Sequence, residues 1–217
     1  MLLAVFFVSA AYAVPYGARE QAKRIHDRIA GVPPSGIDLI YMTDRISAGF
    51  PLEAAERAIE NSNFYNVTLK THVAPWTNRD QSIFAPLNDY TATVIGMVYN
   101  DADFRDILSR NVIYTYTGTN PNVRDYDRSN NQHYEDIEAA GINIGDALKS
   151  NDFGEDTQQS KIGIPAAAAA GVMTTRAAAE AFFVAGTNRA MLRFTLLNHM
   201  CVDLEQVQDA TRIPDRI

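Results

Sequence analysis

Short amphipathic segments follow one another along most of this chain, and glycine or proline ends several of them. Residues 19–30 place alanine and isoleucine on one face, which is the spacing of an amphipathic helix. Gly31 and the pair Pro33-Pro34 then stop this helix, because proline lacks an N–H group and clashes with the preceding turn. The pattern predicts a mainly α-helical protein.

Other segments of the chain carry the same helical periodicity. Predicted helices span residues 19–30, 35–49, 52–60, 64–73, 87–99, 101–108, 133–140, 142–148, 174–185 and 188–200. Residues 190–201 are apolar nearly all round, which predicts a centrally buried helix. Residues 111–117 form the one strand-like pattern, and they have no obvious partner, so an extended connector is the alternative. We therefore expect an irregular multi-helix bundle with long polar loops and at most one short β pairing near 111–117.

Four regions follow from this pattern along the 217 residues. We expect a signal peptide at 1–13, an N-terminal helical region at 14–110, a loop-rich connection with short helices at 111–165, and a C-terminal helical hairpin at 166–217. Two long polar stretches, 118–132 and 151–163, are predicted to be loops. The hairpin is expected to be truncated, because nothing in the last residues has the composition of a tail.

The first residues resemble a secretory signal. An unbroken apolar run from Leu2 to Val8 leads to small residues at Ala11 and Ala13, where we expect cleavage. The usual positive charge before the run is missing. The run is shorter than the roughly 20 apolar residues that a membrane-spanning helix needs, and no later segment is apolar enough. The sequence thus predicts a periplasmic or extracellular protein.

Charge and cysteine content exclude some classes of protein. The formal net charge of −7 argues against nucleic-acid binding, which needs a net basic face. Cys201 is the sole cysteine, so the chain cannot hold an internal disulfide. With 47% hydrophobic residues, a packed core can supply the stability instead.

The sequence contains no phosphate loop, no nucleophile elbow, no zinc-protease motif and no Cys-x-x-Cys-His haem site. Whether the chain is an enzyme therefore stays open. His199 and Cys201 are candidate cofactor ligands, but residues two apart on a helix point to different faces, which favours core packing of both. His26 and His72 are isolated and are interpreted as structural or surface residues.

Two further groups of polar residues could carry chemistry. His133 and Glu135, close to other carboxylates on one short helix, are candidate metal ligands, although a solvated helix face has the same composition. Trp76, followed by Arg79 and Asp80, could stack on a sugar, with an interdomain anchor as the favoured interpretation. The sequence Asn66-Val-Thr68 is a glycosylation sequon. A hydrolase would need two carboxylates in one cleft, and the candidates are Asp80, Asp89, Glu135 and Asp136.

Two stretches resemble a known family. Arg24–Ser35, with its Gly-x-Pro-Pro-Ser turn, is followed by a helix, an alanine-rich helix and Asn-Phe-Tyr at 63–65. This order is similar to the Leu-Thr-Gly-x-Pro-Pro-Thr segment of planctomycete-type cytochrome c proteins. Residues 170–175, then 185–189 and a helix ending at Cys201, resemble another module of unknown function from the same proteins.

The resemblance covers about a third of the chain and implies a place beside c-type haem domains. In such proteins a Cys-x-x-Cys-His segment commonly follows, so we expect haem only in a part beyond Ile217 and no cofactor within this chain. No functional residues of the family carry over.

These observations lead to one main hypothesis and two alternatives. The main hypothesis is an exported helical scaffold or partner-binding region of a multidomain cytochrome-like protein, which supports electron transfer and has a c-type cytochrome domain or another electron-transfer protein as its partner. One alternative is an oxidoreductase or polysaccharide-acting enzyme whose cofactor site lies outside this chain. The other is a surface binding module with Trp76 and the tyrosines at its contact patch.

Overall fold

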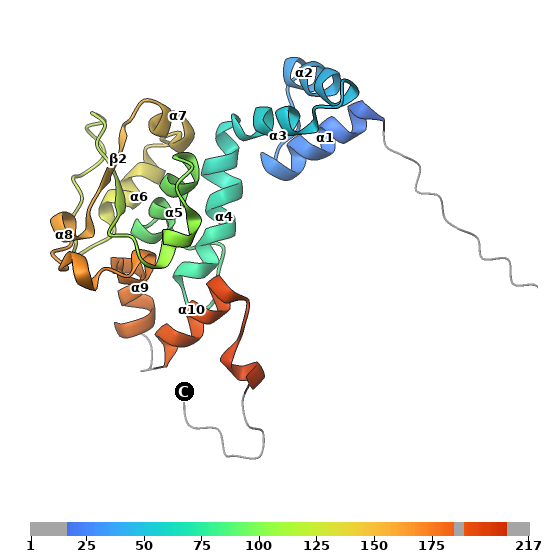
Figure 1. Ribbon diagram of the computed structural model, residues 1–217. Helices are drawn as coiled ribbons and strands as arrows, with labels where there is room; N and C mark the ends of the chain where they lie inside the picture. Colours follow the sequence, from blue (N-terminus) through green and yellow to red (C-terminus); the bar gives the residue numbers. More distant parts are fainter. Residues whose placement is uncertain (1–16, 185–188, 208–217) are drawn as a thin grey trace, which may run out of the picture. The chain divides into compact units, whose positions relative to one another are not determined.

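The computed structural model describes residues 17–184 and 189–207. The predicted signal peptide and the turn of the hairpin at Gly186 lie outside these residues. The described part is mostly helical with one two-stranded sheet, which confirms the predicted mainly α class (Figure 1). The chain divides into two compact units with the boundary between Ile59 and Glu60, which we call unit 1 and unit 2. This boundary falls inside the region predicted as 14–110.

Unit 1 is a set of three short helices. They are α1 (Ala18–Ile29), α2 (Gly36–Ser47) and α3 (Pro51–Ile59). The Ser35 side chain accepts the N–H of Asp38 and so caps α2, as its position in the sequence predicts. The three helices contact one another around a small core of Ala22, Leu39, Met42, Ala54 and Ala58. His26 is buried, and its Nδ1 lies 2.6 Å from the carbonyl oxygen of Val32, so it has a structural role.

Unit 2 is built from many short helical segments. Its α-helices are α4 (Lys70–Val73), α5 (Asp89–Tyr99), α6 (Gln132–Ala139), α7 (Ile144–Lys149), α8 (Gln158–Lys161), α9 (Arg176–Ala178) and α10 (Ala190–Met200). Its described residues also include the π-helical segments η1 (Phe64–Leu69) and η6 (Ala179–Val184). The 3-10 segments are η2 (Ala74–Thr77), η3 (Phe104–Leu108), η4 (Ala166–Ala168), η5 (Gly171–Thr174) and η7 (Leu204–Val207).

Helix α5 is the centre of unit 2. Asn88 caps it by accepting the N–H of Thr91, and every residue from Asp89 to Met97 is buried. The helix contacts α4, α7, α9 and the strand β1 (Ile113–Tyr116), which surround it in Figure 1. The sequence-based prediction of a buried helix over residues 87–99 is thereby confirmed.

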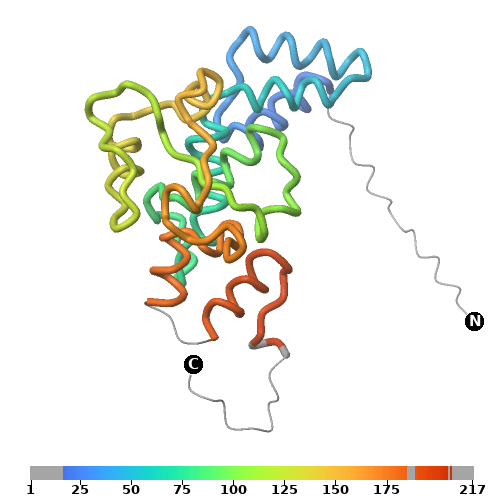
Figure 2. The backbone as a smooth tube through the Cα atoms, turned by 60° about the vertical axis from the view of Figure 1, so that its left-hand side comes forward, coloured from blue at the N-terminus to red at the C-terminus, as the bar shows by residue number. Residues whose placement is uncertain are grey.

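The prediction that residues 190–201 form a centrally buried helix is wrong. Of α10, only Ala190 and Phe194 are buried, while Leu192 and Met200 are more than half exposed. The helix lies beside η6 (Figure 2). The rings of Phe182 and Phe194 stack there with centroids 4.9 Å apart. Helix α5 already occupies the centre of unit 2. Helix α10 therefore packs at an edge of the unit and leaves several of its apolar side chains exposed.

The sheet joins two segments that are far apart in the sequence. Strand β1 pairs antiparallel with β2 (Phe153–Asp156), in a register that sets Ile113 opposite Asp156. A short β pairing near 111–117 is therefore confirmed, whereas the alternative of an unpaired connector is wrong. The partner strand lies within residues 151–163, which were predicted to be a loop. The sequence did not indicate this strand, because Phe-Gly-Glu-Asp has few of the β-branched residues that are typical of strands.

Among residues 17–184 and 189–207, no helix combines the length and apolarity that a membrane crossing requires.

Candidate functional site

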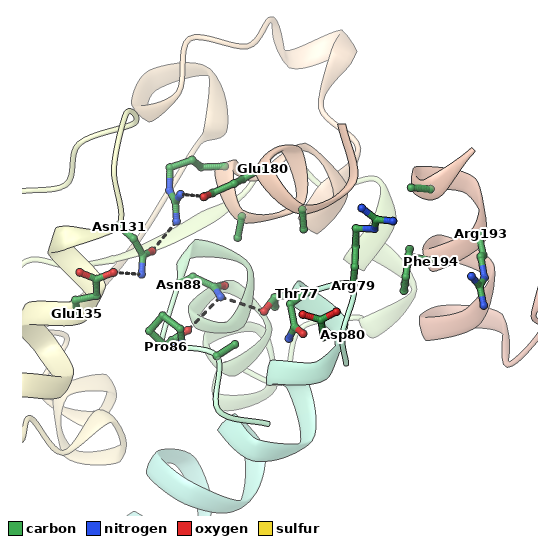
Figure 3. A pocket seen from close by; sticks show the side chains of 16 residues that line it. Thr77, Arg79, Asp80, Pro86, Asn88, Asn131, Glu135, Glu180, Arg193 and Phe194 are labelled. Atoms are coloured by element: carbon green, nitrogen blue, oxygen red, sulfur yellow. Dashed lines mark hydrogen bonds and ion pairs between the residues drawn. The ribbon is translucent and has the colours of Figure 1, made fainter. Parts of the chain in front are cut away.

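A pocket of about 650 Å³ opens within unit 2. Segments from several parts of the chain line it: η2 and the residues after it, the entry to α5, helix α6, the α9–η6 segment, and α10 (Figure 3). Its size falls within the roughly 300–1,000 Å³ that ligand pockets usually have. The pocket is therefore the candidate site within the described part of the chain.

One wall is a continuous string of hydrogen-bonded side chains. Asn131 donates from Nδ2 to Glu135, at 3.3 Å, and accepts at Oδ1 from Arg176, at 2.7 Å. Arg176 in turn donates to Glu180 at 2.5 Å, one helical turn further on. The dashed lines in Figure 3 follow this string from Glu135 to Glu180. These bonds hold the side chains in one arrangement before any ligand arrives.

The entry to α5 forms a second fixed part of the lining. Asn88 donates from Nδ2 to Thr77 Oγ1, at 3.1 Å, and to the carbonyl oxygen of Pro86, at 3.2 Å. Its Oδ1 caps α5, so the amide has partners on both sides. Both Asn88 and Thr77 are buried. They make this side of the pocket rigid.

Asp89 is fully buried at the N-terminus of α5. Its two oxygens accept the backbone N–H groups of Arg176 at 2.6 Å and Ala177 at 3.0 Å, which are the first of α9. Burial raises the pKa of this carboxyl, and the backbone donors of Ala177 and Arg176 oppose the rise. Asp89 therefore joins α5 to α9 and places the Arg176 side chain on the pocket wall.

The charged side chains that line the pocket are balanced in number. Three arginines, Arg79, Arg176 and Arg193, face three carboxylates, Asp80, Glu135 and Glu180. Arg193 donates to Asp203 at 2.9 and 3.0 Å. Among the described residues, the buried Nε of Arg176 has no hydrogen-bond partner. The lining thus contains charged side chains of both signs in equal number.

His199 and Cys201, the candidate cofactor ligands, are not brought together as a ligand pair. His199 Nε2 lies 2.7 Å from the hydroxyl of the buried Tyr90, and burial lowers the pKa of the imidazole. The Trp76 ring meets His199 edge-on at 5.5 Å. Cys201 caps the end of α10 in a left-handed conformation and is exposed, so the prediction that it packs in the core is wrong. The C-cap position requires a left-handed backbone conformation, and it does not require the side chain to be buried.

His133 and Glu135, the candidate metal ligands, point to different surroundings. His133 is buried, with Nδ1 2.6 Å from the carbonyl oxygen of Arg124 and Nε2 accepting the N–H of Tyr116 at 3.0 Å. Both ring nitrogens therefore have partners, and burial lowers the pKa of the ring. Glu135 lines the pocket. In the part of the chain that the structure describes, no group of three His, Cys, Asp or Glu side chains could hold a metal ion.

Of the four carboxylates considered for hydrolysis, two line the pocket and two do not. Asp80 and Glu135 line the same pocket. Asp89 is fully buried and does not line the pocket. Asp136 is bound by Arg124, whose hydrogen bonds lower the pKa of Asp136 to about 2. A hydrolytic pair drawn from these four could only be Asp80 with Glu135.

The remaining residues singled out in the sequence have structural contacts. The Trp76 ring is half-buried and also meets His72 edge-on at 5.4 Å. The Asn66 amide of the sequon donates to the carbonyl oxygen of Ile142 and accepts the N–H of Ile144. The Asn66 side chain therefore links η1 to the start of α7.

The sequence-based reasoning did not foresee Asn131, Arg176 or Glu180. The i, i+4 spacing of Arg176 and Glu180 signals an ion pair on a helix, and Thr175 before them signals a helix cap. Neither signal indicates a pocket, because the other walls come from distant segments.

No family model matches this chain, and no match was found among curated proteins or solved structures.

Proposed function

We propose that unit 2 binds a small polar ligand in its pocket, and that the protein positions this ligand outside the cytoplasm for an electron-transfer partner. The observation that carries the proposal is the hydrogen-bonded wall of Glu135, Asn131, Arg176 and Glu180 beside a cavity of about 650 Å³. A cavity of this size with a few fixed polar groups is typical of small-molecule sites.

The fixed wall favours binding because it lowers the cost of ordering side chains on association. Asn131 is held by Leu87 as well as by its neighbours in the string, and Asn88 is held on three sides. A ligand therefore meets groups that already have their bound positions. The burial of Asp89 and the pairing of Asp136 favour positioning over hydrolysis, since they leave few carboxylates for acid–base work.

A pocket-filling substitution tests the proposal. Ala181 lines the pocket and is half-buried, so Ala181→Trp should fill the cavity. Ala139, exposed at the end of α6, gives the control Ala139→Trp. Ligand-observed NMR with a mixture of polar metabolites should identify compounds that bind the full chain and the control but not Ala181→Trp. Equal binding by Ala181→Trp, or no binding by any chain at millimolar concentration, would overturn the proposal.

A second candidate function concerns unit 1 and a haem-bearing partner. The apolar run before Ala13 supports export to the periplasm or beyond, and the Arg24–Ser35 segment, which resembles modules found beside c-type haem domains, lies in unit 1. On α2, Ile37, Ile40 and Tyr41 share one face at i, i+3 and i+4 spacing and are 77%, 61% and 42% exposed. We infer that this face docks a c-type cytochrome domain.

The docking proposal predicts the effect of a charge placed on this face. Ile40→Glu should weaken binding to a purified c-type cytochrome from the same organism by about tenfold or more, because a desolvated apolar contact is lost and a charge is buried. Isothermal titration calorimetry measures the affinity, and Glu56→Lys, at an exposed position of α3, is the control. An unchanged affinity for Ile40→Glu would contradict docking at this face.

A further inference from the structure

The three arginines that line the pocket already have partners within the protein, and this restricts the class of ligand that the pocket can hold. Arg176 pairs with Glu180, and Arg193 pairs with Asp203. Arg79 has a partner as well. An anionic ligand would have to displace these partners before it could use a guanidinium group, which costs part of the binding free energy. The pocket is therefore poorly suited to a carboxylate or a phosphate.

Open hydrogen-bond acceptors lie in the same lining. Among the described residues, no hydrogen bond or ion pair engages the exposed carboxylate of Asp80, and Glu135 accepts through only one of its oxygens. A hydroxyl group can donate a hydrogen bond, so a ligand with several hydroxyls can bond both carboxylates at once.

Another part of the lining is apolar. This apolar surface consists of Phe194, Pro86 and the methyl groups of Ala177, Ala181 and Ala190. Sugar rings present C–H groups on their faces and hydroxyls around their edges, and this combination matches a pocket with apolar surfaces between polar groups.

We propose that the pocket binds a neutral saccharide, whose hydroxyl groups donate hydrogen bonds to Asp80 and Glu135. This inference rests on the proposed binding function and names the ligand class of the same site. Asp80 and Glu135 are carboxylates and accept these bonds, while the Arg176 side chain forms part of the pocket wall. The wall of Asn131 and Glu180 keeps the Arg176 side chain in place.

Three classes of probe test the inference on the full chain. The neutral probes are maltotriose, cellobiose and chitobiose, the anionic probe is citrate, and the cationic probe is spermidine. We expect saturation-transfer NMR and calorimetry to detect a neutral oligosaccharide, with an affinity that changes less than twofold between low and high salt, since no charge on the ligand is screened. Asp80→Asn should weaken this binding about tenfold. The matched control is Asp125→Asn, because Asp125 is also an exposed carboxylate but does not line the pocket.

Other results would overturn the saccharide assignment. Spermidine or citrate binding that falls steeply with salt and is lost in Ala181→Trp, without saccharide binding, would leave the binding function standing and refute the ligand class. Saccharide binding that survives in both Asp80→Asn and Ala181→Trp would place the sugar elsewhere. If no probe of any class binds while the metabolite mixture still yields pocket ligands, the saccharide class is wrong and the pocket function is retained.

Discussion

Asp89 supports the pocket without reaching it. Its oxygens accept the first two N–H groups of α9, and it is fully buried. Asp89→Ala would leave those buried donors without partners, at a cost of about 2–4 kcal/mol in the free energy of unfolding. Urea unfolding followed by circular dichroism measures this change. Asp125→Ala, at an exposed position, should stay within about 0.5 kcal/mol of the parent. A loss below about 1 kcal/mol for Asp89→Ala would refute the capping role.

Buried histidines make the stability of unit 2 depend on pH. Burial lowers the pKa of His133 and of His199, so the folded chain resists a proton that the unfolded chain accepts at about pH 6.5. The unfolded state then binds more protons, and the free energy of unfolding falls as the pH drops below about 6.5. His133→Gln can keep one donor and one acceptor for Arg124 and Tyr116. We expect this variant to lose less stability than the parent between about pH 7 and pH 5 in urea titrations. An equal or larger loss would contradict the assignment.

At the scale of elements, η5 packs directly on the end of η3. A Cβ atom at Gly171 would collide with the carbonyl oxygen of Ile107, and the backbone of Gly171 has a φ of +55°, which favours glycine. Gly171→Ala should therefore destabilise the chain by about 3 kcal/mol. Gly36→Ala, at a helical position where a Cβ meets nothing within 4 Å, should be neutral or stabilising. Thermal unfolding of both variants compares them, and similar midpoints would refute the close approach.

The elements also explain which predictions the sequence could support. The amphipathic periodicity of residues 19–30 and 87–99 is local, and both helices were predicted close to their observed bounds. Strand β1 was found by its β-branched residues, but β2 owes its pairing to a partner some forty residues away. Helix α10 is less buried than its sequence predicts, because a helix that is apolar all round need not be the one at the centre of the fold. Local pattern therefore predicts elements better than it predicts their neighbours.

At the scale of the whole molecule, the pocket depends on segments that no local pattern connects. Thr77, Asn131, Arg176 and Phe194 line it from four separate parts of the chain. Asp80 and Glu135 were singled out for hydrolysis from residue type alone, and the structure brings them to the same pocket. The sequence could propose these polar side chains, but their common cavity required the packing of unit 2 around α5.

The division into two units leads to a last prediction about independent folding. Unit 2 holds α5, the sheet and the pocket, whereas the core of unit 1 is small and rich in alanine. Domains near 40 residues bury too little surface to be more than marginally stable without disulfides or metals. We therefore expect a fragment of residues 60–217 to keep a cooperative thermal transition within a few degrees of the midpoint of the full chain. A fragment of residues 17–59 should lose most of its helical circular dichroism on mild heating.

Differential scanning calorimetry and circular dichroism of the two fragments make this comparison. Gly171→Ala introduced into the fragment 60–217 should lower its midpoint as it does in the full chain, because Gly171 and its contact Ile107 both lie in that fragment. The added methyl group acts on contacts within unit 2, so the presence of unit 1 should not change the size of the effect. A fragment 60–217 that is unfolded while the full chain is folded would show that unit 2 requires unit 1 and that the two are one cooperative domain.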